Sequence, residues 1–271
     1  MKIAVSSIAW TKEEEPAVAE LLQSLGVKYV EIAPTKKWDE PVNASDNDIE
    51  AYKKWWKRYD IEIVAFQSML FAHTEYKLFE SVENRQQTLD YLKDFIKLAG
   101  KIGARKMVFG SPKNRQKGEL SRTDADLIAT DFFSELADVA EANGVVFCIE
   151  PNATQYNCDY ITNATEGLEL VKTVNKPGFG LHLDTACMAL ASDDIASSIK
   201  NASEYLKHFH VSAPMLEAVN ATTNIDHTTA AAALQEINYD GFVSIEMRAG
   251  EIGTNVDRVK AAIEFTQDIY L

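Results

Sequence analysis

The stretch VAEANGVVFCIE (139–150) joins the end of an amphipathic helix, a glycine and a β-rich run that ends in a carboxylate. A glycine directly after a helix adopts the left-handed backbone that closes it, and the apolar run that follows is typical of a buried parallel strand. The same order returns in LLQSLGVKYVEI (21–32), LAGKIGARKMVFG (98–110) and ALQEINYDGFVSIE (233–246). The chain is therefore predicted to alternate helices with parallel strands.

The opposite joints, from strand to helix, carry the chemistry of helix starts. An oxygen-bearing side chain is followed three residues later by an acid, as expected of an N-cap with a carboxylate near the positive end of the helix dipole. Three pairs have this spacing: Thr11 with Glu14, Thr123 with Asp126, and Asn163 with Glu166. Strands are therefore expected to lead directly into helices.

Eight segments have the composition of buried strands and are separated by predicted helices. They are 2–9, 27–33, 61–67, 105–110, 145–150, 178–184, 206–212 and 241–246. Eight alternating units in a chain of this length match the usual size of a closed (β/α)8 TIM barrel. An open doubly wound sheet is the alternative, but SSIAWT (6–11) stands where its glycine-rich phosphate loop would follow the first strand. The sequence predicts one barrel domain over residues 1–271, in which the eighth strand closes on the first.

The charge and cysteine content narrow the classes of partner. The 271 residues include 41 acidic and 27 basic side chains, for a net charge of -14. Such a surface repels phosphate backbones and anionic lipid, so neither nucleic acid nor a membrane is expected as a partner. The apolar stretches are too short to span a bilayer, and the three cysteines include no Cys-x-x-Cys pair. We expect a cytoplasmic protein without disulfides or a structural zinc knuckle.

Four consecutive predicted strands end in side chains that bind metal ions. These residues are Glu150, Asp184, His210 and Glu246. Active-site groups of a TIM barrel lie at the carboxyl ends of its strands, and side chains from neighbouring strands converge there. Three carboxylates and one imidazole form a hard site that suits Mn²⁺, Mg²⁺ or Co²⁺ better than a thiolate-rich zinc site would. The alternative is that these acids only cap loops and helices.

Other polar residues share this end of the barrel. Glu31 ends the second strand and fits the same face from the opposite side of the barrel, so it either belongs to the site or is only a loop or supporting acid outside the ligand set. Side chains two residues before each ligand should point inward below it, because strand side chains alternate. These are Cys148, His182, His208 and Ser244. The two histidines could orient ligand carboxylates, whereas packing is the simpler role for Cys148.

A resemblance extends over nearly the whole chain. The segments that carry it are FCIEPN (147–152), PGFGLHLDTACM (177–188), HFHVSAP (208–214) and INYDGFVSIEMR (237–248). Together they resemble the xylose isomerase-like TIM-barrel superfamily, in the sugar phosphate isomerase/epimerase group that is similar to the ketose 3-epimerases. The resemblance implies that the four strand-end residues hold Mn²⁺ or a related ion, with Mg²⁺, Co²⁺ or Zn²⁺ as alternatives. It also implies that Glu150 and Glu246 act as acid and base.

The sequence departs from the ketose 3-epimerases at two places. Those enzymes usually carry a histidine three residues after the aspartate ligand, where this chain has Cys187. They also carry an arginine shortly after the histidine ligand, whereas HVSAPMLEAV (210–219) has none. Both groups would normally touch substrate oxygens, so the substrate of those epimerases does not transfer to this chain.

The expected activity is epimerisation or isomerisation of a small sugar or polyol-derived ketone. A metal would polarise the carbonyl and stabilise the enediolate, while two carboxylates move the proton on and off the adjacent carbon. A dehydratase is the nearest alternative, because the same intermediate can expel water. An abasic-site endonuclease is disfavoured by the acidic charge, and a non-catalytic sugar-binding barrel is a further alternative. Superfamily members often form oligomers, so a homo-oligomer is possible.

Six more residues are candidates for contacting the substrate. They are Trp10, Phe66, His73, Cys187, His227 and Arg248. Trp10 and Phe66 would form an apolar wall against a sugar face, unless they pack in the core. Arg248 would meet a phosphate or carboxylate of the substrate or pair with a nearby acid. His73 would reach a substrate hydroxyl or lie at the surface, and His227 precedes the helix after the seventh strand.

Overall fold

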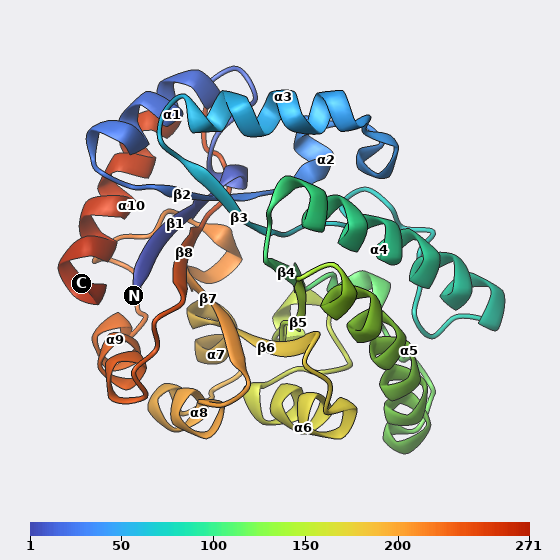
Figure 1. Ribbon diagram of the computed structural model, residues 1–271. Coiled ribbons are helices and arrows are strands. Elements are labelled where there is room, and N and C mark those ends of the chain that lie inside the picture. Colours follow the sequence, from blue (N-terminus) through green and yellow to red (C-terminus); the bar gives the residue numbers. More distant parts are fainter.

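A computed structural model describes residues 1–271, in which eight parallel strands form a closed barrel in sequence order (Figure 1). The strands are β1 (Lys2–Ser6), β2 (Tyr29–Ile32), β3 (Glu62–Phe66), β4 (Lys106–Phe109), β5 (Val146–Ile149), β6 (Phe179–Asp184), β7 (Leu206–Ser212) and β8 (Phe242–Glu246). The TIM-barrel prediction is confirmed, and each strand lies inside its predicted segment. Closure is made by β8, which pairs with β1 through Ile3 opposite Val243 and Val5 opposite Ile245.

Helices surround the barrel on its outside (Figure 1). They are α1 (Glu15–Ser24), α2 (Pro34–Lys37), α3 (Asp46–Lys57), α4 (Val82–Ile102), α5 (Arg122–Ala142), α6 (Ala164–Val174), α7 (Thr185–Leu190), α8 (Ile195–Asn201), α9 (His227–Glu236) and α10 (Asn255–Tyr270). None of them combines the length and the apolar character that crossing a bilayer requires.

The helix starts agree with the sequence in one case of three. Asn163 caps α6, and its side chain accepts a hydrogen bond from the Glu166 N–H at 3.0 Å. The prediction at Thr123 is wrong, because α5 begins two residues earlier and Ser121 accepts from the Asp124 N–H. The prediction at Thr11 is also wrong.

At Thr11 the roles of the two residues are reversed. The Glu14 carboxylate accepts from the Thr11 N–H at 3.0 Å, and α1 starts only after Glu14. A single oxygen-to-acid spacing therefore does not distinguish the cap from its neighbours when several polar residues adjoin.

The hydrophobic core lies between the strands and the helices. Its main part is a cluster of 68 buried residues, which includes Phe133 on α5 stacked on Phe179 of β6 with ring centroids 4.9 Å apart. Burying a side chain of this size stabilises the fold by about 1.5–3 kcal/mol. Because the apolar side chains occupy the layer outside the barrel, its inside is left for polar residues near the carboxyl ends.

Two irregularities of the sheet lie beside polar inward residues. The pairing of β2 with β3 shifts register between Val30 and Glu31, and that of β6 with β7 shifts between Leu181 and His182. Such bulges re-aim the side chain that follows them. Both Glu31 and His182 are fully buried inside the barrel.

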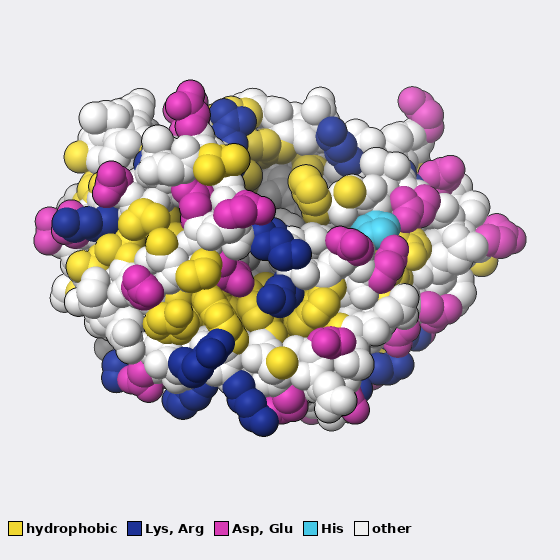
Figure 2. All heavy atoms as spheres, turned by 90° about the horizontal axis from the view of Figure 1, so that it is seen from above, with side chains coloured by type: hydrophobic (Ala, Val, Ile, Leu, Met, Phe, Trp, Pro, Cys, Tyr) yellow, Lys and Arg dark blue, Asp and Glu magenta, His cyan; other side chains and the backbone are white.

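The surface mixes both signs of charge. Figure 2 shows acidic and basic side chains interspersed with hydrophobic ones on the face that it presents, without a continuous basic area on that face. With a net charge of -14, the molecule as a whole repels other polyanions.

Candidate metal centre and active site

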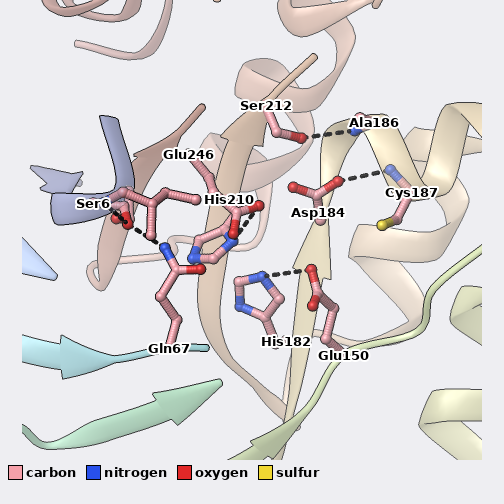
Figure 3. Close-up of polar contacts among 12 residues, drawn as sticks. Ser6, Gln67, Glu150, His182, Asp184, Ala186, Cys187, His210, Ser212 and Glu246 are labelled. Carbon is pink, nitrogen blue, oxygen red and sulfur yellow. Dashed lines mark hydrogen bonds and ion pairs between the residues drawn. The ribbon is translucent and has the colours of Figure 1, made fainter. Parts of the chain in front are cut away.

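The carboxyl ends of β5, β6, β7 and β8 bring four side chains together at one end of the barrel. Each of Glu150, Asp184, His210 and Glu246 offers a ligand atom, and these atoms all lie within 4.8 Å of one another. Figure 3 shows the four side chains pointing toward a common point. Strands one position apart place such groups side by side, so no loop has to move to form the cluster.

Glu150 has the environment of a carboxyl group that gains and loses a proton near neutrality. Burial raises its pKa to about 8, and the negative charges of Glu246 and Asp184 act in the same direction. Burial and the Glu246 charge also raise the pKa of Asp184. Three acids held this close repel one another, and a cation between them would relieve that repulsion.

Two buried polar atoms at the cluster have no hydrogen-bond partner. Asp184 caps α7 with Oδ1, which accepts from the Cys187 N–H at 2.7 Å, and this leaves Oδ2 unpartnered. His210 Nδ1 has no hydrogen-bond partner either, although it lies 3.3 Å from Glu246 Oε2. Leaving a buried polar atom unsatisfied costs about 1–3 kcal/mol. Both atoms are metal ligands by chemistry, so the residues present fit a divalent ion.

Glu31 lies directly behind His210. Its Oε2 is 2.9 Å from His210 Nε2, and the Ser244 hydroxyl donates to the same oxygen at 2.6 Å. Burial alone would raise the pKa of Glu31, but the imidazoles of His210 and His208 outweigh it and hold the pKa well below its usual value. A carboxylate there fixes the proton of His210 on Nε2 and leaves Nδ1 facing the cluster. Glu31 is thus a supporting residue rather than a loop acid.

The residues two positions before the ligands form a layer beneath them. Cys148, His182, His208 and Ser244 are all fully buried. His182 Nε2 lies 3.7 Å from Glu150 Oε1, and His208 Nε2 lies 3.3 Å from Glu31 Oε2. Burial, reinforced by the neighbouring His210 and His208, keeps the pKa of His182 well below its usual value. The layer therefore presents neutral imidazole to the carboxylates above it.

A cavity of about 640 Å³ opens above the cluster. Glu150, Asp184 and Glu246 line its floor, and loops after β3 and β4 line its outer part, with Phe71 and Lys113 among the side chains there. This volume lies within the ~300–1,000 Å³ range of small-molecule sites. The cavity can therefore hold a substrate against the candidate ligands.

Two of the six predicted substrate contacts line this cavity. Cys187 and His73 do so. His73 is also held by Glu75, at 2.8 Å from its Nδ1, and by the Tyr91 hydroxyl, at 3.2 Å from its Nε2. Its ring nitrogens are thus already engaged by the protein.

The other four predicted contacts do not line the cavity. Trp10 is buried edge-on against Trp56, and Phe66 belongs to the hydrophobic core. His227 is buried at the start of α9 with its Nδ1 2.9 Å from the Tyr270 hydroxyl, and Arg248 is exposed. For Trp10 and Phe66, the packing alternative describes what the structure shows.

Sequence reasoning missed three residues next to Glu150. Gly110 directly follows β4 and lies so close to the Glu150 carboxylate that an added Cβ would collide with Oε2. Asn152 and Arg115 are buried beside it, and the Arg115 guanidinium donates to the Glu150 carbonyl oxygen at 2.6 Å. The only available signal was FCIEPN, in which an asparagine follows the predicted ligand by two residues.

Comparisons with known proteins agree with this architecture. The family model described as xylose isomerase-like TIM barrel matches residues 19–269. A D-psicose 3-epimerase of Ruminiclostridium cellulolyticum is 34% identical over 125 residues, which are 45% of this chain and 42% of that enzyme. The chain thus matches less than half of the length of this curated relative.

Solved structures are similar over the whole chain. A crystal structure of D-psicose 3-epimerase with D-tagatose from Clostridium cellulolyticum H10 has a TM-score of 0.81 at 21% identity, covering 100% of this chain and 99% of that one. A crystal structure of the IOLI protein with a binding zinc atom has a TM-score of 0.80 at 19% identity, covering 100% and 98%. At these identities the similarity establishes the shared fold.

Proposed function

Because the chain belongs to the xylose isomerase-like TIM barrel family, we propose that it is a metal-dependent epimerase or isomerase of a small sugar-like ketone. The observation that carries this proposal is the cluster of Glu150, Asp184, His210 and Glu246, whose three carboxylates line the floor of an open cavity. The similarity to a D-psicose 3-epimerase supports the same class of reaction.

In this proposal the four clustered residues hold one divalent ion, and Mn²⁺ is the ion that we propose. The set has three oxygen ligands and one nitrogen ligand, which suits Mn²⁺, Mg²⁺ or Co²⁺, and Zn²⁺ is the remaining alternative. When bound, the ion would polarise the carbonyl of the substrate and stabilise negative charge on its oxygens.

The protein's own residues handle the proton. Glu150 lies on the floor of the cavity, where its carboxylate can take a proton from a bound substrate or return one to it. Glu246 reaches the same cluster from β8, three strands away from β5, so the two carboxylates approach a bound carbon from different sides. One would remove the proton next to the carbonyl and the other would return it. A base in position contributes about 10²–10⁴ in rate.

A dehydratase is the second candidate, and the thiol of Cys187 at the cavity wall is the observation that keeps it open. An epimerase of the ketose type would place an imidazole there. After the same proton abstraction, loss of a β-hydroxyl would give a conjugated enone, which absorbs ultraviolet light, whereas epimerisation gives no such product.

The test measures whether the native, metal-loaded protein catalyses the incorporation of solvent deuterium into ketoses and keto-polyols. Glu150→Gln and Glu246→Gln should each lower exchange by at least about 10²-fold, because each removes a group that moves the proton. Glu62→Gln is the matched control, since Glu62 is exposed at the opposite end of the barrel where β3 begins. Full activity of both site variants would rule the mechanism out.

The proposal extends to the cellular location of the enzyme and to its binding partners. We propose a cytoplasmic protein that acts on a small molecule, alone or as a homo-oligomer, and that binds neither nucleic acid nor membranes. The net charge of -14 supports the last two points, because it opposes association with polyanions and anionic lipid.

A further inference from the structure

Arg115 is a buried cation without an acidic partner. It lies in the loop between β4 and α5, its exposure is 0%, and no carboxylate lies within ion-pair distance of its guanidinium. Removing a charge from water costs several kcal/mol unless hydrogen bonds compensate it. A buried arginine of this kind therefore needs an explanation in its contacts.

All of its contacts are to strand ends and to one loop. The Nε–H donates to the Gly110 carbonyl at 2.7 Å, and the Nη1 group donates to the Tyr160 and Ile161 carbonyls at 3.0 and 3.4 Å. The Nη2 group donates to the Glu150 carbonyl at 2.6 Å and to Asn152 Oδ1 at 2.7 Å. Five donor contacts satisfy the planar guanidinium, whose fixed fork lysine cannot reproduce.

These acceptors surround one proposed ligand. Gly110 follows β4, Glu150 and Asn152 follow β5, and Tyr160 with Ile161 belong to the loop before α6. The Asn152 amide also donates to Cys187 Sγ at 3.6 Å, which ties the same network to the start of α7. Arg115 thus joins the backbone that carries the Glu150 carboxylate to the two segments on either side of it.

We propose that Arg115 is a positioning residue, which holds Glu150 in the place where it binds the metal and moves the proton. It acts through the Glu150 backbone and Asn152 and does not itself touch the cavity. This inference rests on the proposed function, because it assumes that Glu150 is a ligand. Arg115 fixes the orientation of the Glu150 carboxylate. Without the guanidinium, the carboxylate would still be present but could tilt away from the other ligands.

A merely structural role would make a different prediction. In that case, Arg115 variants would unfold more readily, but the folded molecules would bind metal as the wild type does. A positioning role instead lowers metal affinity in molecules that remain folded, and supporting residues of this kind typically change affinity by about 10–100-fold.

The experiment titrates metal-free protein with Mn²⁺ and measures the dissociation constant by calorimetry, with urea unfolding of the same samples as the stability readout. The variants are Arg115→Lys, Asn152→Ala and the double variant. Arg122→Lys is the matched control, because Arg122 lies at the start of α5, is partly exposed and pairs with Asp126 and Glu166 away from the cavity. Arg115→Lys and Asn152→Ala should each weaken binding by about 10–100-fold, and Arg122→Lys by less than about twofold.

The double variant shows whether the two residues act together. If Arg115 works through Asn152, the loss in the double variant will be smaller than the product of the two single losses. The inference would be overturned if both single variants, Arg115→Lys and Asn152→Ala, fold and bind Mn²⁺ like the wild type. If Arg115→Lys does not fold, Asn152→Ala decides, and unchanged binding by this variant overturns it. If wild type binds no Mn²⁺, or Glu150→Gln binds it equally well, the proposed function fails instead.

Discussion

Gly110 shows how one missing side chain shapes the site. A methyl group there would collide with Glu150 Oε2, which is the free end of a flexible side chain and can move aside. Gly110→Ala should therefore fold normally and yet weaken Mn²⁺ binding by at least about tenfold, because the carboxylate is displaced. Gly250→Ala is the control, since the atoms nearest to its methyl group belong to the flexible side chain of Arg258. Equal metal affinity of the two variants would contradict this explanation.

Glu31 provides a second test at the scale of single residues. Glu31→Gln keeps the size of the side chain but removes the charge that fixes the His210 ring from behind. Mn²⁺ affinity should fall by about 10–100-fold. The metal-free protein should also unfold at a lower temperature, because the change leaves the buried His210 imidazole without its carboxylate partner. Glu15→Gln serves as the comparison, because Glu15 is a half-buried glutamate that accepts from the Tyr52 hydroxyl, far from the cluster. An unaffected Glu31→Gln protein would leave Glu31 with only a packing role.

The sequence predicted the cluster of four residues because ligand position follows from strand ends. Once the strand ending at Glu150 is recognised, its neighbours in the barrel place Asp184, His210 and Glu246 at the same end. The residues that support Glu150 were not predictable in this way. Arg115 reaches it from an irregular loop, and its contacts depend on where backbone carbonyls lie after folding. Trp10 was predicted to line the cavity, but it packs against Trp56 in the core. The sequence around an aromatic residue after a strand does not show whether its side chain lines a cavity or packs in the core.

At the scale of elements, the first turn of α5 distinguishes the predicted cap from the observed one. Ser121 accepts from the Asp124 N–H at 3.1 Å, whereas Thr123 lies within the helix. Ser121→Ala should reduce the free energy of unfolding by about 0.5–2 kcal/mol, and Thr123→Ala should change it by less than about 0.5 kcal/mol. Urea unfolding of the two variants provides the measurement. A larger loss in Thr123→Ala would restore the cap that the sequence indicated.

Strands were predicted more reliably than helix boundaries, for a physical reason. A buried parallel strand needs a continuous apolar run, and runs such as VVFCI (145–149) are bounded by a glycine and an acid. Helix starts depend on which of several polar side chains accepts the first free N–H group. At SRTD (121–124) three oxygen-bearing residues compete, and spacing alone chose the wrong one.

For the whole molecule, the buried acids predict how stability depends on pH. Without metal, Glu150 keeps a proton in the folded chain up to about pH 8, whereas in the unfolded chain it has lost that proton above its usual pKa. The folded state therefore binds more protons in this range, so stability is greatest at the lower pH and falls as the pH rises toward 8. His210 contributes in the same direction, because Glu31 and Glu246 outweigh the effect of burial and raise its pKa.

The free energy of unfolding of metal-free protein should drop by about 1 kcal/mol per pH unit on average between pH 6.5 and 8 for Glu150 alone. Urea unfolding at these two pH values measures the slope. Glu150→Gln should show a smaller slope, since glutamine does not titrate. Stability that rises over this interval in wild type would show that the acids are less buried, or less mutually repelling, than the structure has them.

Two different parts of the barrel form the proposed metal site and the entrance to the cavity. The candidate ligands come from β5 to β8, whereas much of the outer wall of the cavity comes from loops after β3 and β4. Grafting those two loops from a relative with another preference would create a chimera that changes which molecule enters and keeps the same chemistry beneath it. In such a scaffold, substrate selectivity can change during evolution while the reaction stays the same, because different segments of the chain determine the two properties.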